Sequence, residues 1–143
     1  MRKPRILVVG SFVMDLITTT RVFPASGETV LGESFANAPG GKGANQAVQA
    51  ARLGADVTMV GKVGQDGFGD QLLSSAKASG VHVDKVARDQ NGVSSAVGNI
   101  TLEVDEKGDR HNRIIVVSGA NMTITEQDIS FLKEEIAQYD LVM

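Results

Sequence analysis

The stretch that decides the fold is residues 38–54, which read APGGKGANQAVQAARLG. Three glycines and a lysine, within Gly40–Gly43, open the segment, and small apolar residues then recur at helical spacing. We predict a helix over residues 44–53 that ends at Gly54 as its C′ residue. Because the apolar face of this helix is mostly alanine, we expect it to pack closely on a sheet.

Apolar runs typical of strands stand on both sides of this helix in the sequence. Residues 6–9 form a continuous apolar run closed by Gly10, and residues 56–63 carry a second strand pattern. A second helix over 70–79 and a short strand over 81–86 follow. This alternation predicts the α/β class, with a parallel-sheet core and flanking helices.

Two segments interrupt the alternation, at about residues 16–35 and 94–118. Threonines, glycines and a proline in the first segment favour short extended pieces joined by turns. The second contains a β-hairpin pattern with arms at 100–104 and 113–117. We predict that the two segments together form a small separate sheet.

The last part of the sequence predicts one more helix and one more strand. Thr125–Asp128 offers an N-cap and an acidic first turn to a helix that runs to about Tyr139. Residues 140–143 then begin the pattern of a buried strand. Since a sheet strand that ends as it starts is unusual, we expect the chain to be a fragment of a longer protein.

Composition narrows the classes of function. The chain has 143 residues, 42% of them hydrophobic and 22% charged, as in ordinary soluble globular proteins. A net charge of −3 and an aromatic content of 4% speak against nucleic acid as a partner. Without cysteine, disulfides and thiolate zinc sites are excluded. The apolar run near the N-terminus is too short for a signal peptide or a membrane span, so we expect a cytoplasmic protein with no membrane partner.

The glycine cluster is the strongest candidate for chemistry. The first amides of a helix are free to donate hydrogen bonds, Lys42 adds a positive charge, and Asn45 adds a donor and an acceptor. The cluster is not a P-loop, because Ala36 and Gly43 occupy positions where that motif has glycine and a hydroxyl residue, and the dinucleotide fingerprint fails after Gly10. Two interpretations stay open: a ligand-binding helix start, or a tight loop that feeds a closely packed helix.

Asp15 is the second candidate. We expect it just past the carboxyl end of the first strand, where ligands of open α/β sheets bind. Its carboxylate can accept two hydroxyl hydrogen bonds, the usual way to hold a sugar, or it can cap a loop. Asp66 fits a turn residue better than a ligand, and His82 and His111 have no second histidine or cysteine at metal-ligand spacing.

These features resemble the N-terminal half of the ribokinase, or PfkB-type, carbohydrate kinases. The motifs that carry the resemblance are Gly10-Ser11…Asp15, Pro24…Gly27-Glu28-Thr29, Gly40-Gly41-Lys42-Gly43-Ala44-Asn45-Gln46-Ala47, Gly61…Gly64-Gln65-Asp66…Gly69 and Ser118-Gly119-Ala120-Asn121. The resemblance covers essentially the whole of residues 1–143. It implies a ribokinase-like α/β fold, with the C-terminal half absent, in which the segments at about 16–35 and 94–118 form a β lid over the sugar.

The resemblance also implies which residues would hold the sugar. Four positions match residues that hydrogen-bond the sugar hydroxyls in the family: Asp15, Gly41, Lys42 and Asn45. The position matching Val116 packs on the sugar. Many members have asparagine two residues before the aspartate, and this sequence has Val13 there, which cannot make that polar contact.

The activity implied for the longer protein is phosphorylation of a small sugar, D-ribose at its terminal hydroxyl, to give ribose 5-phosphate. Members of the family use ATP, Mg²⁺ and a monovalent cation such as K⁺, and they form homodimers lid to lid. The second family signature, Gly-Ala-Gly-Asp, which contains the catalytic base, does not occur in the 143 residues. We therefore expect no catalytic, cofactor-binding or metal-binding residue in this chain, no bound cofactor, and no turnover.

Three alternatives remain open at this stage. The substrate could be another sugar or a nucleoside. The chain could be a truncated sugar-binding or regulatory module. It could also be a folding or dimerisation fragment with no ligand.

Overall fold

The computed structural model of the protein describes residues 2–143. Its α/β core is a four-stranded sheet in the order β10-β1-β4-β6, and every neighbouring pair is parallel. The strands are β1 (Arg5–Val9), β4 (Asp56–Val60), β6 (Val81–His82) and β10 (Leu141–Val142). The parallel core predicted from the alternation of elements is confirmed.

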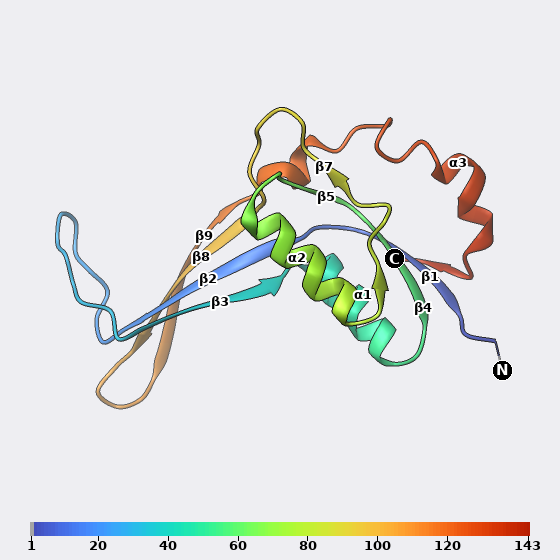
Figure 1. Ribbon diagram of the computed structural model, residues 1–143. Helices are drawn as coiled ribbons and strands as arrows, with labels where there is room; N and C mark the ends of the chain where they lie inside the picture. Colours follow the sequence, from blue (N-terminus) through green and yellow to red (C-terminus); the bar gives the residue numbers. More distant parts are fainter. Residues whose placement is uncertain (1) are drawn as a thin grey trace.

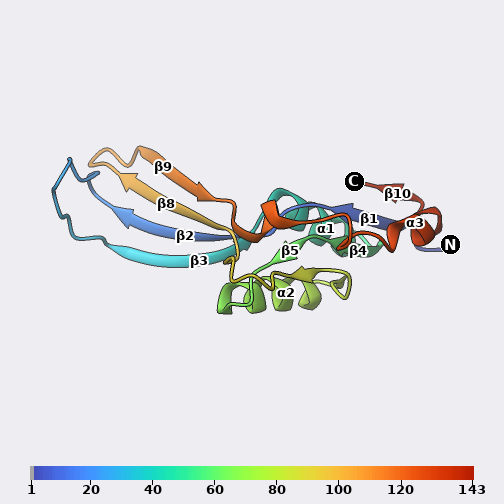
Figure 2. The same cartoon turned by 90° about the horizontal axis from the view of Figure 1, so that it is seen from above.

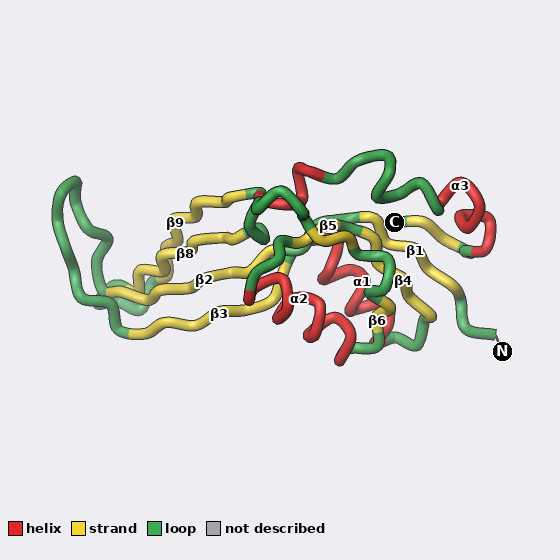
Figure 3. The backbone as a smooth tube through the Cα atoms, turned by 45° about the horizontal axis from the view of Figure 1, so that its top comes forward, coloured by secondary structure: helices red, strands yellow, loops and turns green. Residues whose placement is uncertain are grey.

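Two helices pack on one face of this core. They are α1 (Lys42–Arg52) and α2 (Gly67–Ala78), which Figure 3 shows in red beside each other. Val8, Val57 and Met59 of the sheet are buried against the apolar faces of these helices. Each such buried side chain contributes roughly 1.5–3 kcal/mol. The helix predicted over 44–53 is confirmed with its start two residues earlier.

A second four-stranded sheet projects away from the core. Its order is β3-β2-β8-β9, formed by β2 (Val13–Thr20), β3 (Ser34–Gly40), β8 (Val97–Val104) and β9 (Arg110–Val117). β2 and β8 are parallel, and the two outer pairs are antiparallel. In Figures 1 and 2 the β2–β3 loop and the β8–β9 turn lie at the end farthest from the helices.

The strands of the second sheet are longer than the sequence patterns predicted. The short extended pieces expected from residue 16 onward are one eight-residue strand that starts at Val13. Asp15, expected in a loop after the first strand, therefore lies inside β2. Similarly, the first hairpin arm starts at Val97 rather than at residue 100. Pairing between β2 and β8, more than 80 residues apart in sequence, extends both strands.

The strand predicted over 56–63 is divided. β4 ends at Val60, and after Gly61 the chain enters β5 (Lys62–Val63), which pairs in parallel with β7 (Ala87–Arg88) in a separate two-stranded sheet. Within residues 2–143 no helix is both long and apolar enough to cross a membrane.

The helix predicted over 125–139 is wrong over most of its length. Only α3 (Leu132–Glu135) and the 3₁₀ turn η2 (Ile136–Gln138) are helical there. The Asp128 carboxylate accepts hydrogen bonds from the Thr125 N–H at 2.8 Å and from the buried Lys62 ammonium at 3.0 Å. These contacts hold the segment in successive i→i+3 turns instead of a regular helix.

The half-buried carboxylate of Asp66 ties α2 to Ser95, two residues before the start of β8. Asp66 caps α2 by accepting the Gly69 N–H at 2.8 Å, and it accepts the Ser95 N–H and hydroxyl, both at 2.7 Å. Burial alone would raise the pKa of Asp66, but these hydrogen bonds outweigh it and the pKa is lowered. Asp66 is thus an N-cap that also holds the segment before β8 against α2, in keeping with its interpretation as a turn residue.

We predict that Asp66→Ala lowers the free energy of unfolding at pH 7 by about 2 kcal/mol, because it removes the cap and leaves Ser95 without its acceptor. Urea denaturation measures this value. Asp70→Ala is a control in the first turn of the same helix: it removes the ion pair of the exposed Asp70 with Arg88 of β7 and should cost less than about 1 kcal/mol.

The pH dependence of stability, compared between the parent and Asp66→Ala, gives a second test. A carboxyl group with a lowered folded-state pKa stabilises the protein above its unfolded pKa and loses this effect as the pH falls through the folded value. The stability difference between the parent and Asp66→Ala should therefore be full at pH 7 and shrink once the pH is below 3.8. A difference that does not change with pH would contradict the role of the ionised carboxylate.

Candidate functional site

The start of α1 packs directly on the backbone that joins β1 to β2. Gly41 has a φ of 100°, and a Cβ placed on it would lie 2.5 Å from the Ser11 carbonyl oxygen. A Cβ on Gly43 would lie 2.7 Å from the Cα of Gly10, and the Ala44 N–H donates to the Ser11 oxygen at 3.2 Å. The glycine cluster is therefore required for close packing, which was one of its two interpretations.

That packing leaves the first amides of α1 available. No side chain caps the helix, and the N–H groups of Lys42 and Gly43 have no intrahelical partner at this position. The positive end of the helix dipole adds to their attraction for a negative or electron-rich atom. A ligand oxygen can bind at this helix start without displacing an internal hydrogen bond.

The Asp15 carboxylate lies across two glycines of the neighbouring strands. A Cβ on Gly40 would lie 2.8 Å from Asp15 Oδ2, and a Cβ on Gly98 would lie 2.7 Å from Oδ1. The residue is half-buried, and its side chain makes no hydrogen bond or ion pair within the described chain. Among the described residues, every fully buried polar side-chain atom has a hydrogen-bond partner. The Asp15 carboxylate oxygens have none, so they are not fully buried and solvent reaches them. Asp15 is an accessible acceptor held next to Gly40, the residue before the α1 N-cap.

Strand register shows which side chains share the face of Asp15. One row across the sheet is Ala38, Asp15, Gly98 and Val116. Val13 lies on the same face, one row nearer to α1, because alternate residues of a strand point to the same side. The sheet thus brings together three predicted site residues, Val13, Asp15 and Val116.

The other three predicted site residues begin α1. Gly41 is its N-cap, and Lys42 and Asn45 are exposed in its first turn. Asn45 also lines a cavity between α1 and α2. These residues are next to Asp15 through Gly40, so the candidate site consists of the helix start and the adjoining face of the second sheet.

Gly98 and Ile100 belong to this face and were missed from the sequence. Gly98 makes room for the Asp15 carboxylate, and Ile100 lies in the next row, opposite Ile17. The alternation that begins at Val97 could have indicated their face, but only after the pairing of β8 with β2 was known.

A second hollow lies at the carboxyl edge of the core sheet. Its volume is about 280 Å³, and its lining includes Ser11 after β1, Lys62 after β4, and Asn121 of the 3₁₀ helix η1 (Gly119–Thr123). The Asn121 side chain holds the β1–β2 connection, since it accepts the Phe12 N–H at 3.1 Å and donates to the Phe12 oxygen at 2.8 Å. The Lys62 ammonium is already paired with Asp128.

The parallel core, its covering helices and the projecting mixed sheet define a ribokinase-like α/β fold. The matching family model is described as pfkB family carbohydrate kinase and covers residues 3–143. The chain therefore belongs to the PfkB family of carbohydrate kinases.

Individual relatives agree with this assignment. The chain is 48% identical to the ribokinase of Bacillus subtilis over 138 residues and 41% identical to that of Lactococcus lactis over 140 residues. It is 36% identical to the deoxyribokinase of Salmonella typhi over 141 residues. These matches cover 96–97% of the chain but only 44–45% of each relative.

Solved structures show the same fold. A ribokinase from Giardia lamblia superposes with a TM-score of 0.84 at 30% identity, over 98% of this chain and 44% of its own. An Arabidopsis thaliana ribokinase complexed with ribose and ATP superposes with a TM-score of 0.74 at 29% identity, over 93% of this chain and 43% of its own. The chain thus spans less than half the length of these relatives.

The contact at Gly41 gives a direct test of the packing. Gly41 and Gly54 have nearly the same positive φ, 100° and 98°, but only Gly41 has an atom close to the position of a Cβ. We predict that Gly54→Ala costs about 1–2 kcal/mol of unfolding free energy from backbone strain alone. Gly41→Ala should cost about 2 kcal/mol more, since the helix must also move away from Ser11. Equal losses in urea denaturation would refute the close packing.

Proposed function

We propose that this chain forms the sugar-binding part of an ATP-dependent carbohydrate kinase whose substrate is D-ribose, phosphorylated to ribose 5-phosphate. The observation that carries the proposal is the Asp15 carboxylate, which is open to solvent, has no internal partner, and lies beside the start of α1. A carboxylate and free amides on one site can hold several hydroxyl groups at once. The names of the relatives support ribose as the sugar.

In this proposal the chain supplies orientation. Asp15 accepts hydrogen bonds from two sugar hydroxyls, the helix start with Gly41, Lys42 and Asn45 binds others, and Val13 and Val116 pack on the carbon skeleton. The second sheet acts as a lid that excludes water, so that the phosphoryl group reaches the sugar rather than water.

The proton acceptor and the ATP-binding residues are expected outside these 143 residues. Within residues 2–143, no group of three or more histidine, aspartate or glutamate side chains is arranged to hold a metal ion. The contribution proposed for this chain is sugar binding.

A second candidate substrate is 2-deoxy-D-ribose. The Salmonella typhi relative, 36% identical, is a deoxyribokinase, and Val13 has no polar group to offer a sugar hydroxyl. Comparison of the two sugars in one binding experiment separates these possibilities.

We predict that D-ribose raises the melting temperature of the 143-residue chain and that Asp15→Ala weakens the binding by about tenfold or more, because a charge-assisted hydrogen bond is lost. Isothermal titration calorimetry measures the affinity, with 2-deoxy-D-ribose in parallel. Glu126→Ala, which removes an exposed carboxylate outside the site, should bind ribose like the parent.

Other outcomes of the ribose titration would change the proposal. Equal binding by the parent and Asp15→Ala would sink the proposed site. Tighter binding of 2-deoxy-D-ribose would favour the second candidate. With MgATP and ribose we expect no turnover by these residues alone, and ordinary turnover would contradict the division of roles.

We also propose that the chain forms homodimers through the second sheet. β9 is an edge strand with four consecutive exposed apolar residues, Ile114 to Val117, and such an edge invites association. On the Asp15 face, Ile114 continues a row with Ile17 and Ile100. On the opposite face, the row of Ile115 contains Asn99, Leu16 and Asn37, so two polar side chains interrupt it.

The two faces give matched variants. We predict that Ile114→Lys converts the dimer to a monomer, because it places a charge in the apolar row, and that Ile115→Lys does not. Sedimentation velocity distinguishes the species. A parent that is monomeric, or equal effects of the two lysines, would overturn the proposed interface.

A further inference from the structure

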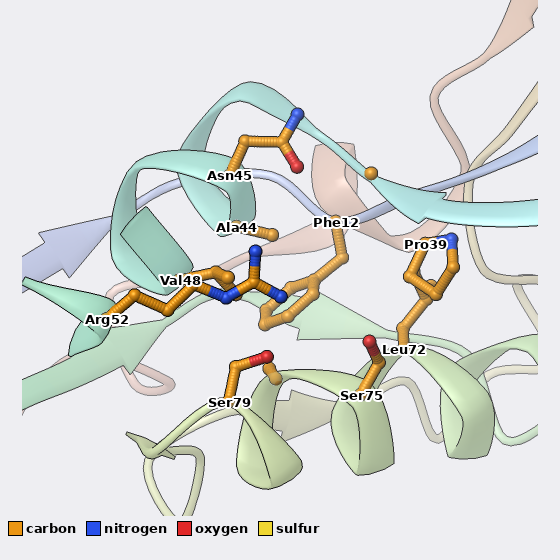
Figure 4. Close-up of a pocket in the computed structure, with 11 residues that line it drawn as sticks. Phe12, Pro39, Ala44, Asn45, Val48, Arg52, Leu72, Ser75 and Ser79 are labelled. Carbon is orange, nitrogen blue, oxygen red and sulfur yellow. The ribbon is translucent and has the colours of Figure 1, made fainter. Parts of the chain in front are cut away.

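A cavity of about 180 Å³ lies between α1 and α2, on the helix side of the core. Figure 4 shows its lining, which comes from both helices, the β1–β2 connection and the end of β3. The apolar part consists chiefly of Phe12, Val48, Leu72 and Ala76, of which Phe12 and Leu72 are almost completely buried. The cavity therefore has a fixed apolar floor.

The polar part of the cavity centres on Arg52. Its guanidinium extends into the cavity, and Ser75 and Ser79 of α2 lie on the opposite wall (Figure 4). Within residues 2–143, Arg52 makes no ion pair and no side-chain hydrogen bond. A guanidinium offers five donors in a planar fork, and its natural complement is a carboxylate bound through both oxygens.

The helix ends restrict the charge of the ligand. Arg52 is in the last turn of α1, and Ser79 is the C-cap of α2, so the negative ends of two helix dipoles lie beside the cavity. They stabilise the positive charge of Arg52 and disfavour negative charge, so a dianion is disfavoured more than a single charge that Arg52 neutralises. A single negative charge held directly by Arg52 fits this environment better than phosphate does.

We propose that this cavity binds a small organic monocarboxylate, with its carboxylate on Arg52 and its short apolar body on Phe12 and Leu72. The volume has room for about six water-sized groups, which is the number of non-hydrogen atoms in isobutyrate. Ser75 and Ser79 donate to the carboxylate oxygen that faces α2. Of the residues proposed to hold the sugar, only Asn45 also lines this cavity, so the inference does not depend on the proposed function.

The test is a titration of the ¹⁵N-labelled 143-residue chain with sodium isobutyrate, followed by amide chemical shifts. We expect saturable shifts concentrated in residues 44–53 and 72–79. Isobutyramide, which has the same shape without the charge, should bind about tenfold more weakly or not at all, and inorganic phosphate should bind more weakly than isobutyrate.

Variants locate the site. Arg52→Gln should weaken isobutyrate binding about tenfold or more, and Ser75→Leu, which fills the cavity, should abolish it. Arg110→Gln removes an exposed arginine of β9 and should leave the affinity unchanged. Unchanged binding by Arg52→Gln, shifts spread over the surface, or phosphate binding as tightly as isobutyrate would overturn the proposal.

Discussion

The backbone of α1 touches the backbone of the β1–β2 connection, and this contact sets where the helix start lies relative to the second sheet. Gly41 and Gly43 lie so close to Ser11 and Gly10 that a single added carbon on either would overlap the neighbouring chain. The contact brings the free amides of the helix start beside β2 and Asp15. The two interpretations of the glycine cluster are therefore compatible, because close packing places the amides where a ligand can reach them.

In the second sheet, glycines also allow close contact, here with the Asp15 carboxylate. A half-buried carboxylate without an internal partner is costly unless solvent or a ligand satisfies it. Gly40 and Gly98 have no Cβ that would collide with the carboxylate oxygens, and the row of Ile17, Ile100 and Ile114 begins directly beyond it. The sheet thus presents one polar group at its base and an apolar surface further out, a distribution suited to a polyhydroxylated ligand below and an apolar partner above.

Local patterns predicted the parallel core, α1 and the hairpin, because each of these is specified by residues close together in sequence. The length of β2 and the place of Gly98 could not be predicted in this way, since they depend on pairing between strands far apart in the chain. The helix expected over 125–139 failed for a related reason. Its N-terminal signal was correct locally, but Lys62, 66 residues away, binds the Asp128 carboxylate and holds the segment in turns.

The carboxyl edge of the core sheet shows how far these residues reach toward phosphoryl transfer. The strand order reverses between β1 and β10, the place where open α/β sheets usually bind ligands. Among the residues that line the hollow at this edge, Lys62 is the one cation, and its charge is neutralised by Asp128. A transferred phosphoryl group needs positive charge around it, and among residues 2–143 the lining of this hollow offers no cation besides the paired Lys62. The free groups of the candidate site, Asp15 and the first amides of α1, are instead of the kind that bind hydroxyls, as the proposed sugar-binding role requires.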